Sequence, residues 1–172
     1  MGGSMESALH SGGADEALVM EGKRRPTPIV RDAHALMVRG IEELERNHIE
    51  EAVGLLRQSV ELDAESFHAQ LALGIALTKA LRIPEAECAL RTAIDLEPVN
   101  FWGHLRLAEM FQRVGVPTSA LEELQLALDL APTSAERKIA RDLVDAEQRR
   151  NVGRAWRPDF LRLLRGKGKR SK

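Results

Sequence analysis

The residues most suggestive of chemistry are two histidines, His34 and His68, which occupy equivalent places in a repeated pattern. Imidazole nitrogens bind metal ions and transfer protons near neutral pH. Neighbouring packed helices, however, lie about 8–10 Å apart, whereas a shared metal ion needs each ring nitrogen at about 2 Å. No acidic residue or cysteine follows either histidine by three or four residues. We therefore interpret both as side chains that face a groove.

No other pattern predicts catalysis. The sequence has no glycine-rich phosphate loop, no nucleophile elbow and no paired carboxylates placed by strands. The acidic runs Glu42-Glu43 and Glu50-Glu51 are expected on solvated helix faces. The single cysteine, Cys88, excludes an intramolecular disulfide and a multi-cysteine metal site, and we expect it to pack inside a helix pair. The sequence predicts a protein that is not an enzyme, with no catalytic residue, cofactor or metal ion.

The composition is typical of an all-α protein. The chain has 172 residues, of which 44% are hydrophobic, 30% charged and only 3% aromatic, with many Ala and Leu. No apolar run approaches the roughly 18 residues of a membrane span. Residues 17–20 form too short an apolar run for the core of a secretory signal. We therefore expect a cytoplasmic protein.

A period of about 34 residues runs through the chain. The aligned pairs include Phe67 with Phe101, Leu73 with Leu107, Ala86 with Ala120, Leu90 with Leu124, Ala93 with Ala127, and Pro98 with Pro132. A fixed period of this length indicates stacked supersecondary units, each too small to bury its apolar face alone. Arrays of this kind usually bind other proteins.

Start and stop signals divide each unit into two helices. Residues 1–26 are rich in Gly, Ser and charge and are expected to form a flexible arm, of which residues 1–4 resemble a cloning scar. Thr27 and Pro28 begin the helical region. The expected order is a first unit over 33–66 with a turn at Asn47, helices at about 67–80 and from Pro84 to before Pro98, helices at about 101–114 and from Pro117 to before Pro132, and a last helix at about 134–150.

The last expected helix closes the array. Thr133 and Glu136 have the spacing of a capping box. Ile139, Leu143 and Ala146 are expected to cover the exposed face of the third unit, because a solenoid needs a terminal cap.

Small residues recur at fixed places of each unit. They are Gly40, Gly74 and Ala108; Ala52, Ala86 and Ala120; and Ser59, Ala93 and Ala127, with unit ends at Ala64, Pro98 and Pro132. This pattern resembles the tetratricopeptide repeat (TPR) family over residues 33–150, although the first unit departs from it at Arg39 and Glu43. The resemblance implies a right-handed all-α solenoid of antiparallel helix pairs, in which residues 27–150 form three TPR units with a C-terminal capping helix.

In this family the first helix of each unit, helix A, lines a concave groove. Carried over to this sequence, the groove positions are His34, Met37, Ile41, Leu44, His68, Leu71, Ile75, Thr78, Trp102, Leu105, Glu109 and Gln112, with Arg106 beside them. Most of these residues are apolar, aromatic or histidine. The resemblance therefore implies an adaptor or scaffold whose groove binds an apolar or amphipathic segment of another protein. Alternatively, the arm, the tail or a second copy of the chain occupies the groove, or nothing does.

Two known functions of the family make different demands on the groove residues. Some members hold the C-terminal carboxylate of a chaperone with a clamp of Lys, Asn and Arg side chains. In this sequence four clamp positions lack those side chains and only Arg106 fits; the four residues there are Met37, Ile41, Ala72 and Trp102. That function is rejected. Three repeats with an apolar groove also resemble type III secretion translocator chaperones, which stay the alternative.

Residues 151–172 form a basic amphipathic tail with eight cationic residues and one acidic residue, a net charge of +7. Its apolar stripe is Trp156, Phe160, Leu161 and Leu164. Such a stripe flanked by arginines could fold back on the acidic body, bind a partner protein, or tether the chain to nucleic acid or anionic membrane. Nucleic acid and membrane are the less favoured partners.

Overall fold

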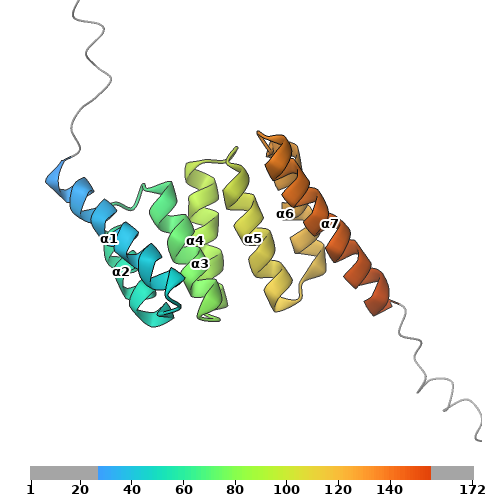
Figure 1. The fold of residues 1–172 in the computed structure, drawn as a ribbon, viewed down its shortest axis with the longest axis horizontal. Helices are drawn as coiled ribbons and strands as arrows, with labels where there is room; N and C mark the ends of the chain where they lie inside the picture. Colours follow the sequence, from blue (N-terminus) through green and yellow to red (C-terminus); the bar gives the residue numbers. More distant parts are fainter. Residues whose placement is uncertain (1–26, 156–172) are drawn as a thin grey trace, which may run out of the picture.

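The computed structural model describes residues 27–155 and consists, over that range, of seven helices without a strand (Figure 1). The helices are α1 (Pro28–Glu45), α2 (Ile49–Leu62), α3 (Phe67–Lys79), α4 (Ile83–Leu96), α5 (Phe101–Val114), α6 (Pro117–Leu130) and α7 (Ser134–Ala155). The predicted all-α architecture is confirmed. The expected arm 1–26 and the apolar stripe of the tail lie outside the described residues.

The helices pack as consecutive pairs. Helix α1 packs on α2, α3 on α4 and α5 on α6, while α7 packs on α6. The first helices of the pairs also contact one another, α1 with α3 and α3 with α5. The side of α1, α3 and α5 that points away from their pair partners is called the A-helix face below. None of the described helices combines the length and the apolar character needed to cross a membrane.

Small residues let the two helices of a pair cross closely. A Cβ added to Gly74 would lie 2.5 Å from Leu90 Cγ, and one added to Gly40 would lie 2.7 Å from Leu56 Cγ. Both leucines are completely buried. The first unit therefore packs as the second does, despite its sequence departures.

The turns inside the three pairs use the same backbone conformation. Asn47, Leu81 and Gly115 have φ values of 64°, 61° and 79°, and successive members of this set are separated by one full repeat. This left-handed region is easy for Gly, accessible to Asn and unfavourable for Leu. The repeat therefore imposes one turn geometry on three different residues.

The terminal helix differs from its expectation in two ways. It extends to Ala155 instead of about residue 150, and Ile139 is exposed instead of covering the third unit. Leu143 packs against residues of α5 and α6 as expected, and Ala140 and Val144 pack there in place of Ile139. One residue turns a helix by about 100°, so a small error in the assigned face exchanges Ile139 for Ala140. The expected capping box is present, since Thr133 Oγ1 accepts from Glu136 N at 3.2 Å.

Candidate functional site

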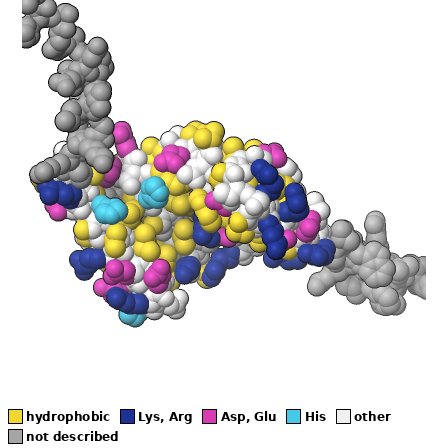
Figure 2. Space-filling view, turned by 45° about the horizontal axis from the view of Figure 1, so that its top comes forward, with side chains coloured by type: hydrophobic (Ala, Val, Ile, Leu, Met, Phe, Trp, Pro, Cys, Tyr) yellow, Lys and Arg dark blue, Asp and Glu magenta, His cyan; other side chains and the backbone are white. Residues whose placement is uncertain are grey.

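The A-helix face changes character along the array. In Figure 2, hydrophobic side chains gather over the part of the visible surface nearer the N-terminal helices, and Lys and Arg side chains gather nearer α7. Among the half-buried apolar side chains of α1 and α3 are Ile41, Leu71 and Ile75, which pack on the core from outside. The expected groove histidines, His34 and His68, are both exposed.

Three residues that were expected to face the groove are buried, so the prediction that they lie at the surface is wrong. Met37, Leu44 and Leu105 are only 9%, 8% and 1% exposed. Met37 and Leu44 belong to the core cluster of the first two units, and Leu105 belongs to the cluster of α5, α6 and α7. Because successive A helices touch, side chains at their sides are covered by the neighbouring helices instead of facing solvent. These three residues stabilise the face from beneath.

Trp102 contacts both an aromatic and a charged side chain of α5. It is 37% exposed, and its ring lies edge-on to Phe101 at a centroid distance of 5.0 Å. The Arg106 guanidinium carbon lies 5.6 Å from the centre of the Trp102 ring, within the range of a cation–π contact. Arg106 also donates to Glu109 at 2.7 Å. A ligand at Trp102 would thus meet an aromatic ring and an ion pair together.

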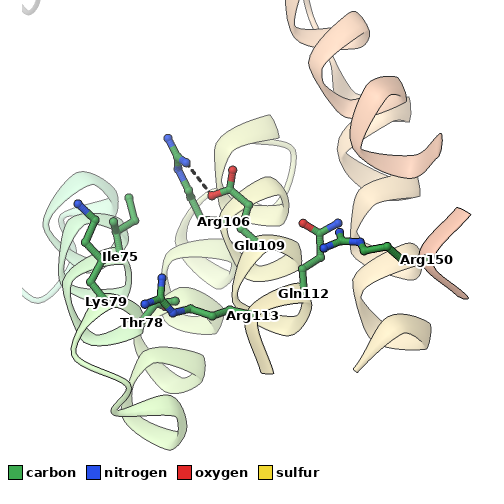
Figure 3. Close-up of a pocket in the computed structure, with 8 residues that line it drawn as sticks. All are labelled: Ile75, Thr78, Lys79, Arg106, Glu109, Gln112, Arg113 and Arg150. Atoms are coloured by element: carbon green, nitrogen blue, oxygen red, sulfur yellow. Dashed lines mark hydrogen bonds and ion pairs between the residues drawn. The ribbon is translucent and has the colours of Figure 1, made fainter. Parts of the chain in front are cut away.

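A cavity of about 350 Å³ follows on the same face, between α3, α5 and α7 (Figure 3). Its lining residues are Ile75, Thr78, Lys79, Arg106, Glu109, Gln112, Arg113 and Arg150. Sequence reasoning assigned only Arg106 among its cations. The missed signal was available, because Lys79 and Arg113 are separated by one full repeat and so occupy equivalent places in successive units.

His104 was not among the site residues predicted from the sequence. In the third unit it is a buried polar side chain with two polar partners. It is buried, and its Nδ1 lies 2.8 Å from Glu123 Oε2 while its Nε2 lies 3.1 Å from the Pro98 carbonyl oxygen. The hydrogen bond with Glu123 raises the pKa of His104 above its usual range, although burial acts in the opposite direction. Gln70 at the equivalent place donates to the Ala64 carbonyl at 3.2 Å. Both residues tie helix A to the preceding loop.

One group of residues has the ligand types of a metal site. Single ligand atoms of Glu43, His48 and Glu51 lie within 4.8 Å of one another. Glu43 already forms an ion pair with Arg46, and its hydrogen bond with His48 at 2.6 Å lowers the pKa of the Glu43 carboxyl. We assign Glu43 and His48 to an ion-pair network with Arg46 at the α1–α2 turn, with Glu51 exposed beside it.

Cys88 is exposed, which corrects the expectation that it packs inside a helix pair. The buried side of α4 carries Ala86, Ala89, Leu90 and Ala93. Cys88 lies off that side and borders a shallow cavity formed with residues of α2 and α3.

Comparisons with known proteins identify the fold. No family model matches the sequence, and no curated protein matches it. Among solved structures, the first TPR domain of human RPAP3 superposes with a TM-score of 0.67 at 14% identity, covering 75% of this chain and 99% of that one. The TPR2B domain of yeast Sti1, in complex with pHsp70, gives 0.66 at 20% identity, covering 70% and 98%.

A third similar structure is the Yersinia enterocolitica type III secretion chaperone SycD in complex with a peptide of the translocator YopD. Its TM-score is 0.62 at 16% identity, with 69% of this chain and 93% of that chain covered. These likenesses confirm the predicted helical solenoid of paired helices.

Proposed function

From the TPR fold of this chain, we propose that the protein is a protein-interaction adaptor whose A-helix face binds an apolar or amphipathic segment of a partner protein. TPR domains of similar structure are known in complex with peptides of other proteins, as for yeast Sti1 and RPAP3. The observation that carries the proposal is that α1 and α3 present the half-buried apolar side chains Ile41, Leu71 and Ile75, and α5 presents the partly exposed Trp102.

The arrangement suits a helix or an extended segment as ligand. Aromatic side chains such as Trp102 are the usual anchors of protein interfaces, because they bury a large area with few rotatable bonds. The leucine and isoleucine side chains are held by the core cluster beneath them. A face that is already ordered loses little conformational entropy on binding, so more of the contact energy appears as affinity.

The test compares two double variants in partner capture. The first is Leu71→Ala with Trp102→Ala on the A-helix face, and the matched control is Leu62→Ala with Leu126→Ala, two exposed residues of α2 and α6. Loss of a well-packed aromatic anchor is expected to weaken binding by about tenfold or more. Helicity and melting temperature, measured by circular dichroism, establish that both variants fold.

The proposal predicts that the captured partner is lost with the first variant and retained with the control. A partner retained equally by both would place the binding site elsewhere on the molecule. As part of the same proposal we expect the protein to act in the cytoplasm, which fractionation of source cells would check.

The second candidate function is that of a translocator-type secretion chaperone. The likeness to SycD, which is in complex with a peptide of the translocator YopD, favours it. This function requires a secreted client with an apolar segment. Identification of a client that is not secreted would remove the candidate while leaving the adaptor proposal intact.

The tail supports a further alternative for partner binding. Trp156, Phe160, Leu161 and Leu164 lie outside the described residues, so docking of this stripe on the body, on a partner or on an anionic surface rests on the sequence. Deletion of residues 156–172 distinguishes these options. If the A-helix face is the binding site, capture of the partner survives the deletion.

A further inference from the structure

Four cationic side chains meet at the C-terminal end of the A-helix face. Lys79 extends from α3, Arg106 and Arg113 from α5, and Arg150 from α7, around the cavity of about 350 Å³ (Figure 3). Glu109 is the one acidic lining residue. The lining therefore has a net charge of +3, although the whole chain has a net charge of −1.

Internal ion pairs neutralise only part of this charge. Arg106 pairs with Glu109 at 2.7 Å, and Arg150 pairs with Glu147. Within the described part of the chain, no carboxylate forms an ion pair with Lys79 or Arg113. Cations gathered without counter-charges repel one another, and a bound anion offsets this repulsion.

The side-chain amide of Gln112 is a neutral hydrogen-bond donor that also lacks an acceptor in the described part of the chain. The side-chain nitrogen of Gln112 is buried and has no hydrogen-bond partner among the described residues. Arg150 extends from α7 toward Gln112 in Figure 3. A buried amide donor without a partner is unfavourable, and a carboxylate in the cavity could accept from it once the Gln112 side chain turns toward the cavity.

The C-terminal end of this chain does not supply the complement. Residues 151–172 have a net charge of +7, the same sign as the cavity. Residues 1–26 contain four acidic residues, all within 6–21, and three basic residues within 23–25. If deletion of residues 5–21 alone created binding of a hexaglutamate peptide, this N-terminal segment and not a partner would be the occupant.

We propose that this cavity binds carboxylate side chains of an acidic stretch in the partner protein. The inference rests on the proposed function and predicts the orientation of the bound partner segment. Its apolar part would lie against α1 and α3, and its acidic part would lie toward α7. The site differs from the family's carboxylate clamp, because Lys79, Arg113 and Arg150 occupy no clamp position and only Arg106 is shared. The cations are confined to one cavity beside apolar surface, which suits an amphipathic peptide better than a long polyanion.

The test uses a hexaglutamate peptide with blocked termini as the probe. Binding is followed by the backbone amide chemical shifts of ¹⁵N-labelled full-length protein, with hexaglutamine as the neutral probe. We expect hexaglutamate to shift amides of α3, α5 and α7 around the cavity, and hexaglutamine to shift none. Raising the salt concentration from about 50 mM to about 300 mM should weaken the binding.

Matched variants locate the site. Lys79→Gln with Arg113→Gln removes two cavity charges, and Lys138→Gln with Arg149→Gln removes two exposed charges of α7 outside the cavity. Because Lys79 and Arg113 are exposed and form no ion pair with a described residue, both variants should keep the wild-type melting temperature. Arg150 is left unchanged because it pairs with the buried Glu147. The cavity variant should bind hexaglutamate about tenfold more weakly, and the control should bind it as the wild type does.

Three outcomes would overturn the inference: absence of hexaglutamate binding, equal loss in the two variants, or binding of a six-nucleotide oligothymidylate as tight as that of hexaglutamate. The last outcome would indicate a general polyanion site. None of these results concerns the apolar residues of the face, because the probe has no apolar side chain. The Leu71 and Trp102 variants therefore test the proposed function separately.

Discussion

The second and third repeats have the same framework and different binding surfaces. Ala86, Leu90 and Ala93 in one correspond to Ala120, Leu124 and Ala127 in the other, and all six are completely buried. On α3 and α5, however, the half-buried Ile75 corresponds to Glu109 and the buried Ala72 to the half-buried Arg106. Positions that keep their residue type from one repeat to the next determine how the helices pack. Positions that change between repeats determine what the surface can bind.

The framework accounts for much of the stability. Leu56, Leu90 and Leu124 are each fully buried at equivalent places of the three units. Burial of one such side chain contributes about 1.5–3 kcal/mol relative to its exposure. Substitutions at repeated positions should therefore change stability, whereas those on the A-helix face should change binding.

The largest expected effect on stability is at the helix crossing of the second repeat. In Gly74→Val the new side chain would collide with Leu90, since even a Cβ lies 2.5 Å from Leu90 Cγ. We expect the free energy of unfolding to fall by about 2–3 kcal/mol. Urea denaturation followed by circular dichroism measures the change.

The control for this substitution is Gly54→Val. A Cβ at Gly54 on α2 meets nothing within 4 Å, so the expected change is below about 0.5 kcal/mol. Equal effects at both glycines would show that the helix crossing is not specifically tight.

The next effect concerns two polar residues with the same role. Gln70 and His104 each bond to a carbonyl of the preceding loop, but His104 also bonds to Glu123. Because the pKa of His104 is raised in the folded state, its contribution to stability is complete below the unfolded pKa of about 6.5. The contribution is lost as the pH rises through the raised folded pKa.

Replacing this histidine by the residue of the second repeat tests the account. At about pH 5.5, His104→Gln should lower the free energy of unfolding by about 1.5 kcal/mol, and by less at about pH 8.5. Denaturation curves at a series of pH values measure the difference from wild type. The exposed His68, changed to Gln, serves as the control. A difference independent of pH would exclude a role for the protonated imidazole.

The smallest effect is at the equivalent turns. Leu81 has the left-handed conformation that Gly115 adopts one repeat later. Leu81→Gly should raise the free energy of unfolding by about 0.5–1 kcal/mol, because relief of the strained backbone exceeds the entropy cost of glycine. The reciprocal Gly115→Leu should lower it by about 1 kcal/mol. Thermal unfolding of both variants checks the pair, and a loss of stability in Leu81→Gly would contradict it.

The sequence predicts the repeated part of this molecule well. Helix starts such as Asn100, which accepts from Trp102 N at 2.9 Å, and the left-handed turn at Asn47 follow from local chemistry. The all-α solenoid follows from the period. The predictions that Cys88 on α4 and Ile139 on α7 are buried were wrong, since both are exposed. A shift of a single position rotates a helix face by about 100°, so a small error in the assigned face is enough to cause this.

The binding surface is less predictable because it depends on contacts between units. Met37, Leu44 and Leu105 have the chemistry of groove residues, yet the neighbouring helices bury them. The cationic cavity combines residues of α3, α5 and α7. Arg150 lies more than one repeat beyond Arg106 in the sequence, and no local pattern joins them.

The most direct test of the central claim measures the affinity of the captured partner for three double variants side by side. We predict the greatest loss for Leu71→Ala with Trp102→Ala. A smaller, salt-dependent loss is expected for Lys79→Gln with Arg113→Gln, and none for Leu62→Ala with Leu126→Ala. Unchanged affinity in the first variant, or an equal loss in the third, would contradict the claim that the A-helix face binds the partner.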